Sequence, residues 1–303
     1  MISVCPTCGA RYRGKLPRCP FDGATLTPAG GELAGLCLGE RFELGELIGA
    51  GAVGVVYHAV DRASGAPAAV KILHRDLATS RMYRERFLRE ARAAMRVVHP
   101  AIGRILAVGE SESTAPWLAM PFYAGSTLRR LLEHGALALE RAASIATTLA
   151  AGLSVAHGAG VVHRDVKPAN IVLLAEHESP VIFDFGLASV QGEPGLTDTG
   201  EVLGTPFYMS PEQVRGEPAC PAMDQYALGC VWFELVTGQP PFVGRPAAIL
   251  DGHATGTPPN VATLAPRLPT AQANVIMQLL DKSTEERALA FARLASGLVS
   301  APA

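Results

Sequence analysis

The chain has 303 residues, 49% of them hydrophobic, so it can build a sizeable core and is not a disordered protein. Its 26 basic and 28 acidic residues give a net charge of −2, which does not favour binding to nucleic acid or another polyanion. No signal sequence opens the chain, and its longest uncharged apolar stretch, residues 142–156, is too short to span a bilayer. These features predict a cytoplasmic protein without a membrane segment.

The first 28 residues contain two similar cysteine-bearing turns. Cys5-Pro-Thr-Cys8-Gly and Cys19-Pro-Phe-Asp22-Gly resemble the two knuckles of a zinc ribbon, with Asp22 where a fourth cysteine is usual. The pattern predicts a Zn²⁺ site made by these four side chains, because a carboxylate can also bind zinc. A metal-free loop and a redox-sensitive thiol cluster are the alternatives.

The same segment has a local excess of basic residues, which suits either nucleic acid or an acidic protein surface. Only Tyr12 and Phe21 are aromatic there, and the segment is short. We therefore expect residues 1–28 to have a structural or protein-binding role, and we expect no nucleic-acid partner.

The pattern of the remaining chain predicts two lobes. Residues 29–39 follow the cysteine-rich segment as a Gly-rich linker. Runs of Val, Ile and Leu then predict strands of an antiparallel sheet at residues 42–48, 53–60 and 68–73. Between residues 81 and 98 one amphipathic helix is indicated by the spacing of Phe87, Ala91, Ala94 and Val98.

Helical patterns dominate the rest of the chain. The main predicted helices are at residues 139–157, 223–237 and 271–280. Two short strands are predicted among them, at residues 171–174 and 181–183. We therefore expect a small β-rich lobe over residues 40–122 and a larger, mainly helical lobe over residues 123–300.

A glycine-rich turn lies between the first two predicted strands. In Gly49-Ala-Gly51-Ala-Val-Gly54-Val-Val56 a backbone without side chains could lie close over nucleotide phosphates. A dinucleotide-binding loop would open a helix, whereas the residues after Gly54 favour a strand.

Lys71 is a cation within an otherwise apolar strand, so it needs an anionic partner. Of the acidic residues on the predicted helix, Glu90 shares the face of the apolar residues, whereas Glu85 points away. We expect Glu90 to pair with Lys71 and to aim its ammonium at the α- and β-phosphates of ATP. A surface lysine at a strand end is the alternative.

Two motifs in the second lobe supply the groups that phosphoryl transfer requires. His163-Arg164-Asp165-Val-Lys167-Pro-Ala-Asn170 is followed by Asp184-Phe-Gly. Asp165 provides a carboxylate for the attacking hydroxyl, Lys167 a cation for the moving phosphoryl group, and the pair Asn170 and Asp184 oxygen ligands for Mg²⁺ or Mn²⁺.

On these motifs, together with Ser210-Pro211-Glu212, the sequence resembles the eukaryotic-like serine/threonine protein kinases of bacteria, from about Phe42 to about Leu298. The resemblance implies an α+β, two-lobed protein kinase fold. It also implies ATP-dependent phosphorylation of protein serine and threonine, autophosphorylation and a part in signal transduction.

The resemblance assigns roles to further residues of the adenine site. Val56 and Ala69 are expected to bind ATP, and Met120 is expected to be the gatekeeper that limits the pocket behind adenine. The hinge departs from the usual pattern, because Pro121 stands where glutamate is common. The carbonyl of Pro121 and the N–H of Tyr123 can still bind adenine, since proline keeps its carbonyl.

In the second lobe the resemblance assigns supporting roles. Lys167 is typical of the serine/threonine branch, and Thr205 is expected to steady Asp165 and Lys167. Glu212 and Arg287 are expected to form a buried ion pair, although Ser283-Thr284 replaces the usual Asp-Pro before that arginine. Asp224 is expected to anchor the backbone of the catalytic loop.

Arg164, directly before the catalytic aspartate, suggests a basic pocket for a phosphate on the activation segment. Thr197 and Thr199 are the candidate phosphorylation sites, because two added negative charges could pair with Arg164 and order the segment. A polar loop without a switch is the alternative.

Two other classes of function remain open at this point. A pseudokinase scaffold would lack Lys71, Asp165 or Asp184, and all three are present. A zinc-dependent nucleic-acid adaptor would show salt-sensitive binding that a chelator abolishes.

Overall fold

The computed structural model describes residues 2–4, 11–13, 17–18, 27–28, 33–51, 53–111, 114–185 and 206–299. The chain divides into two compact units, residues 1–95 with 104–122 and residues 96–103 with 123–303. Residues 96–103, which the sequence pattern places in the small lobe, belong to the second of these units. Ile102 forms a bridge with Ile182, and the N–H of Gly103 donates to the Ile182 carbonyl at 2.7 Å, which ties this segment to the second unit.

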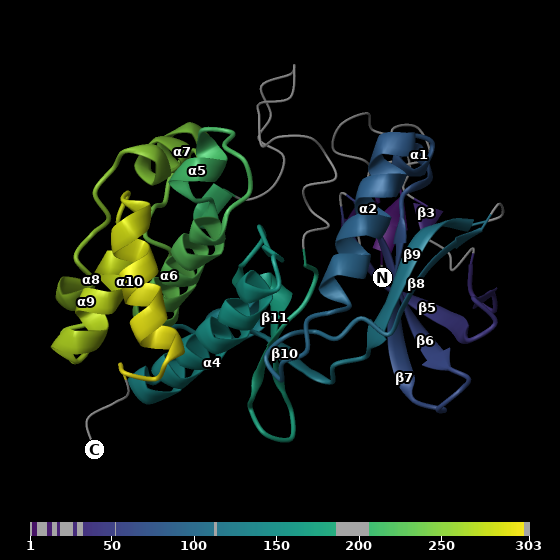
Figure 1. Ribbon diagram of the computed structural model, residues 1–303, viewed down its shortest axis with the longest axis horizontal. Coiled ribbons are helices and arrows are strands. Elements are labelled where there is room, and N and C mark those ends of the chain that lie inside the picture. The colour runs from purple at the N-terminus through teal and green to yellow at the C-terminus, as the bar shows by residue number, and fades with distance from the viewer. Residues whose placement is uncertain are drawn as a thin grey trace. The chain divides into compact units, whose positions relative to one another are not determined.

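An antiparallel sheet of six strands, in the order β4-β5-β6-β7-β9-β8, forms most of the first unit (Figure 1). The strands are β4 (Cys37–Leu38), β5 (Phe42–Ala50), β6 (Gly54–Asp61), β7 (Pro67–Leu73), β8 (Ala107–Ser111) and β9 (Thr114–Pro121). Leu38 pairs with Phe42 and is buried. The end of the expected linker is therefore part of the sheet.

Alternation of side chains gives the sheet two different faces. Ala68, Val70 and Ile72 of β7 point into an apolar cluster. The cluster also contains Leu38, Phe42, Leu44, Val55, Tyr57, Ala59, Trp117 and Ala119. The intervening residues of β7, which include Ala69 and Lys71, therefore belong to the opposite face.

Helices α1 (Arg75–Ala78) and α2 (Arg81–Ala94) follow β7. Helix α2 packs against β8 and β9 (Figure 1). The expected helix was too long, because Val98 lies beyond its end and is 80% exposed. Helix α2 ends at Ala94 with Met95 as its C-cap, where the Met95 N–H still donates to the Ala91 carbonyl at 3.0 Å.

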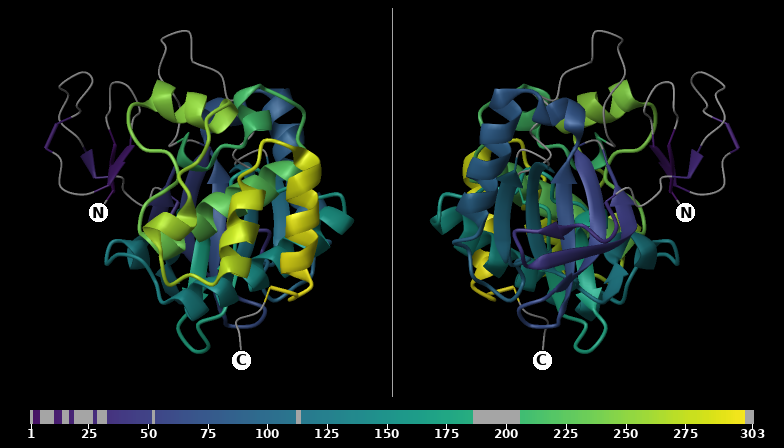
Figure 2. Two further views of the ribbon diagram at one scale, coloured as in Figure 1. Left: turned by 90° about the vertical axis from the view of Figure 1, so that its left-hand side faces the viewer. Right: turned by 90° about the vertical axis from the view of Figure 1, so that its right-hand side faces the viewer.

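Helices dominate the second unit, and their successive parts can be followed in the two views of Figure 2. They are α3 (Leu128–Leu132), α4 (Leu139–Gly158), α5 (Pro211–Val214), α6 (Pro221–Thr237), α7 (Pro246–Ala254), α8 (Val261–Leu264), α9 (Thr270–Leu279) and α10 (Thr284–Ala295). Short 3-10 turns are η1 (Pro168–Asn170) and η3 (Pro206–Tyr208). A small antiparallel sheet has the order β10 (Gly125–Thr127), β11 (Ile171–Leu174) and β12 (Pro180–Ile182).

Helix α6 is the core element of this unit, because residues 222–236 are all buried. A helix that is buried on every side must be surrounded by other elements, and its buried carboxylates, Asp224 and Glu234, need hydrogen-bond partners there. It packs against α4, α9 and α10. Pro221 occupies its first turn, and Gly238 ends it in the left-handed conformation at φ 80°.

Near the N-terminus, β1 (Ile2–Val4), β2 (Arg11–Arg13) and β3 (Thr27–Pro28) form an antiparallel sheet in the order β2-β1-β3. The four predicted zinc ligands, Cys5, Cys8, Cys19 and Asp22, lie outside the described residues. Within the described part of the chain, no helix combines the length and the apolar character needed to cross a membrane.

Candidate active site

Four of the predicted nucleotide-binding residues share one face of the first unit's sheet. In the strand register Val56 lies opposite Lys71, and Met120 lies opposite Ala69. Residues directly opposite one another in antiparallel strands project from the same face. Ala69, Lys71 and Met120 are each less than 9% exposed. On this face, Val56, Ala69 and Met120 therefore place apolar side chains around the ammonium group of Lys71.

The three glycines of the turn between β5 and β6 differ in what the fold requires of them. At Gly54 an added Cβ would lie 2.2 Å from the carbonyl oxygen of Ile72 in the neighbouring strand β7, so there is no room for a larger side chain at this position. At Gly51 a Cβ would meet nothing within 4 Å, and at Gly49 it would make only ordinary contact with Val56. The open space at Gly51 fits a turn whose backbone is approached by a phosphate group.

Lys71 is only 7% exposed, so its charge needs a partner nearby. On α2 the side chain of Glu90 is 11% exposed and accepts a hydrogen bond from Arg86 at 3.2 Å. Glu85, by contrast, is 62% exposed and pairs with Arg81 at the helix surface. Burial therefore favours Glu90 over Glu85 as the carboxylate that serves Lys71.

The backbone at the end of β9, where adenine contacts were predicted, has a defined orientation. The N–H of Phe122 donates to the Pro67 carbonyl of β7 at 3.2 Å. Because the C=O and N–H of one trans peptide point in opposite directions, the carbonyl of Pro121 points away from β7. The pairing of β8 with β9 has already ended at Ala119 on that side. Tyr123 comes directly after Phe122, and with it the chain enters the second unit again.

In the second unit, the carboxylate of Asp165 is held by two side chains of its own loop. Lys167 Nζ lies 2.8 Å from Asp165 Oδ2, and Asn170 Nδ2 donates to the same oxygen at 2.9 Å. Asn170 Nδ2 also donates to the Asp165 carbonyl at 2.9 Å. Since the nitrogen end of this amide faces Asp165, its oxygen is at the other end, as a ligand for a hard cation requires.

His163 connects this loop to the segment that carries Asp184. Its Nδ1 accepts from the N–H of Asp165 at 3.2 Å, so its Nε2 carries the hydrogen that is donated to the Phe183 carbonyl at 3.0 Å. The Phe185 ring lies 4.4 Å from the imidazole, centroid to centroid. His163 thus fixes both neighbours of Asp184, whose backbone is in the left-handed region at φ 75°.

Asp224 of α6 holds the backbone of the catalytic loop. Its carboxylate is fully buried and accepts from the N–H groups of His163 and Arg164, both at 2.7 Å. His157 Nε2 lies 2.8 Å from the same carboxylate. Arg164 has φ 66°, a left-handed backbone that costs about 1–2 kcal/mol for a residue other than glycine. The two bonds from Asp224 offset that cost.

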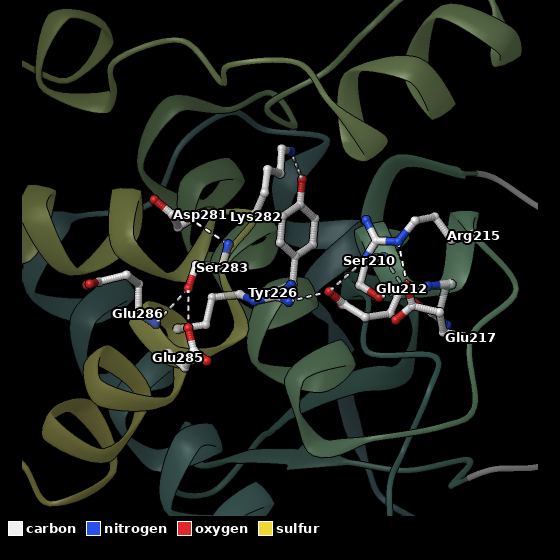
Figure 3. A network of polar contacts seen from close by, with 12 residues as sticks. Ser210, Glu212, Arg215, Glu217, Tyr226, Asp281, Lys282, Ser283, Glu285 and Glu286 are labelled. Atoms are coloured by element: carbon white, nitrogen blue, oxygen red, sulfur yellow. Dashed lines mark hydrogen bonds and ion pairs between the residues drawn. The ribbon is translucent and has the colours of Figure 1, made fainter.

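Glu212 of α5 lies in a network of polar contacts (Figure 3). Within it a buried ion pair ties α5 to α10. Arg287 Nη2 donates to Glu212 Oε1, and both residues are at most 1% exposed. Burial by itself would raise the pKa of Glu212, but the hydrogen bond and the charge of Arg287 hold it below its ordinary value. The departure at Ser283 has a physical compensation, because its hydroxyl accepts from the Glu286 N–H and caps α10.

Some predicted residues lie outside the described part of the chain, and some contacts were not predicted. The activation-segment residues Thr197, Thr199 and Thr205 are in the first group. The second group comprises the contacts of His157 and His163 and the bond from Gln213 to the Arg164 carbonyl. The Ser210-x-x-Gln213 spacing does signal a helix cap, but not the bond to Arg164.

Comparison with known proteins agrees with a two-lobed phosphotransferase. A family model described as protein kinase domain matches residues 42–294. The chain therefore belongs to the protein kinase family.

The relatives are bacterial serine/threonine kinases. A probable serine/threonine-protein kinase of Streptomyces coelicolor is 38% identical over 257 residues, which are 82% of this chain and 38% of the relative. The serine/threonine-protein kinase PknB of Mycolicibacterium smegmatis is 37% identical over 270 residues, 86% of this chain and 43% of the relative. The chain thus spans about two fifths of the length of these curated relatives.

Solved structures show the same fold. One crystal structure of the Mycobacterium tuberculosis PknI kinase domain matches with a TM-score of 0.68 at 26% identity, covering 88% of this chain and 97% of that one. A second crystal structure of the same domain matches with a TM-score of 0.67 at 27% identity, covering 87% of this chain and 98% of that one. The two-lobed kinase fold, with an antiparallel sheet and a helical lobe, is therefore confirmed, whereas neither match tests the zinc-ribbon-like segment.

The glycine analysis predicts different costs for two matched substitutions. Gly54→Ala should lower the free energy of unfolding by about 1–3 kcal/mol, because the new methyl group overlaps the Ile72 carbonyl and β6 or β7 must shift. Gly51→Ala should change it by less than about 0.5 kcal/mol. Urea unfolding of both variants tests this, and equal losses would contradict it.

Proposed function

We propose that this chain is an ATP-dependent serine/threonine protein kinase that takes part in signalling. The observation that carries the proposal is the placement of the Asp165 carboxylate between Lys167 and Asn170, in a loop braced by Asp224. That arrangement holds a base, a cation and an amide oxygen within one rigid loop. Phosphoryl transfer depends on such positioning and on electrostatic stabilisation, with little covalent work left for the protein.

The first unit is proposed to bind the nucleotide. Val56, Ala69 and Met120 supply the apolar surface that an adenine ring requires, and they share the face that carries Lys71. The carbonyl of Pro121 and the N–H of Tyr123 bind the polar edge of adenine. Lys71 neutralises the α- and β-phosphates, with Glu90 as its counter-ion and with the backbone of Gly49, Gly51 and Gly54 over the phosphates.

The second unit is proposed to carry out the transfer. Asp165 orients the substrate hydroxyl and accepts its proton. The hydroxyl oxygen forms a bond to the γ-phosphorus, while the bond between that phosphorus and the β,γ-bridging oxygen breaks. Lys167 offsets charge on the phosphoryl group in transit. Asn170 and Asp184 would hold Mg²⁺ or Mn²⁺, which when bound neutralises charge on the phosphate oxygens.

The preference for serine and threonine rests on Lys167 and on the relatives. Lys167 follows the catalytic aspartate by two residues and contacts it at 2.8 Å. The curated relatives are serine/threonine-protein kinases by name. Protein serine and threonine hydroxyls are therefore the proposed acceptors, and Thr205 is the proposed partner of Asp165 and Lys167 beside them.

Regulation by autophosphorylation is part of the proposal. Arg164 is fixed at its N–H by Asp224, so its guanidinium starts from a defined backbone position. A phosphate on Thr197 or Thr199 would add about two negative charges for Arg164 to pair with. Such charge-assisted hydrogen bonds would order the activation segment.

We also propose that residues 1–28 form a zinc-ribbon-like module. Cys5, Cys8, Cys19 and Asp22 would hold Zn²⁺, which would take the place of an apolar core in so small a segment. Its basic surface suits an acidic protein partner.

The kinase proposal predicts that purified protein with labelled ATP and Mg²⁺ phosphorylates a generic basic protein and itself. Asp165→Asn should reduce transfer by about 100-fold or more, because the amide cannot accept the hydroxyl proton. Asp251→Asn, an exposed change on α7, serves as the matched control and should keep wild-type activity. Phosphate should map to Thr197 or Thr199. Measurable ATP binding by the wild-type protein without transfer would instead favour a scaffold.

The zinc proposal predicts one zinc ion per chain by elemental analysis. Cys8→Ser should lower the zinc content by at least half, since it removes one thiolate ligand. Cys37→Ser is the control, because Cys37 lies in β4, away from the two knuckles in sequence, and should leave the content unchanged. Wild-type protein without zinc after growth in zinc-supplemented medium would overturn the module.

A further inference from the structure

Gln213 occupies the first turn of α5 and completes a capping box. The hydroxyl of Ser210 accepts from the N–H of Gln213 at 3.2 Å, and Gln213 Oε1 accepts from the N–H of Ser210 at 3.0 Å. These two bonds satisfy donors at the start of the helix that have no partner within it. They use only the oxygen of the Gln213 amide.

The nitrogen of the same amide makes a second connection, 49 positions away in the sequence. Gln213 Nε2 donates to the carbonyl oxygen of Arg164 at 2.8 Å. Arg164 has a left-handed backbone at φ 66°, and its N–H donates to Asp224 at 2.7 Å. Both polar groups of this strained residue are therefore held by side chains from other elements, one from α6 and one from α5.

Helix capping alone does not call for glutamine. A glutamate at this position would accept from the Ser210 N–H equally well and would interact favourably with the positive end of the helix dipole. What a carboxylate cannot supply is the N–H that reaches Arg164. The amide is the side chain that meets both requirements.

The helix that carries Gln213 is itself held firmly. Glu212, the preceding residue, is 1% exposed and accepts from the buried Arg287 of α10. Because α5 is fixed, the bond from Gln213 also fixes the peptide group between Arg164 and Asp165. Because Asp165 follows that peptide directly, its carboxylate depends on the orientation that Gln213 imposes.

We propose that Gln213 is a positioning residue for the catalytic aspartate: its amide nitrogen locks the Arg164–Asp165 peptide, while its oxygen caps α5. This inference rests on the proposed kinase function. It touches no nucleotide-binding residue of the first unit, so its loss should affect the rate of transfer and not the binding of ATP.

Three variants separate positioning from capping. Gln213→Glu keeps the size and the capping oxygen but removes the donor to Arg164. Ser210→Ala is the matched control, because it removes one bond of the cap and leaves the bond from Gln213 to Arg164 in place. Gln213→Ala removes both functions.

The kinetic result expected is a loss of kcat of at least tenfold in Gln213→Glu and in Gln213→Ala, with the KM for ATP within about twofold of wild type. Ser210→Ala should lower the thermal midpoint while kcat stays within about twofold of wild type. Wild-type kcat in Gln213→Glu, or an equal loss of kcat in Ser210→Ala, would overturn the proposal. If the wild-type protein transfers no phosphate, the proposed function fails separately.

Amide hydrogen exchange tests whether Gln213 holds the Arg164–Asp165 peptide and does not depend on kinase activity. The segment 161–167 contains the Arg164 N–H, which Asp224 protects. Gln213→Glu should speed exchange in this segment at least tenfold relative to wild type and to Ser210→Ala, because the peptide is released on its carbonyl side. Equal exchange in all three proteins would contradict the lock.

Discussion

The buried carboxylate of Asp224 is the interaction on which the catalytic loop depends. A fully desolvated charge is tolerated only where hydrogen-bond donors surround it, and here the donors include the two backbone N–H groups of His163 and Arg164. The carboxylate comes from α6, which is buried along its length and cannot easily move. A helix buried on all sides therefore sets the position of the loop that carries Asp165.

The neighbouring contacts extend this rigidity. His163 also fixes the segment around Asp184, because it donates to the Phe183 carbonyl and packs against the Phe185 ring. On α5, the buried Glu212 is held by Arg287. Glu234 of α6 binds Tyr208 and Arg129, at 2.5 and 2.9 Å, which connects η3 and α3 to the same helix. These polar bonds, several of them buried, connect the elements around the catalytic loop.

Local patterns predicted what is encoded locally. Contiguous motifs were enough to predict the loop that contains Asp165, and the apolar run around Lys71 was enough to predict its strand. The register of β6 and β7 then places Lys71 on one face with Val56. The contact between Gln213 and Arg164 joins residues 49 positions apart, and no periodicity encodes such a pairing. Val98 continued the apolar spacing of α2 but lies beyond the end of the helix at Ala94, which the spacing alone did not indicate.

The most direct test of this account is the kcat of Asp224→Asn beside its dissociation constant for ATP. The amide has one acceptor oxygen, so one of the two backbone N–H groups would face an NH₂ group and lose a bond of about 1.5–3 kcal/mol. We predict a fall in kcat of about 100-fold, with ATP affinity within about threefold of wild type. A folded variant with wild-type kcat would contradict the claim that this carboxylate holds the catalytic loop.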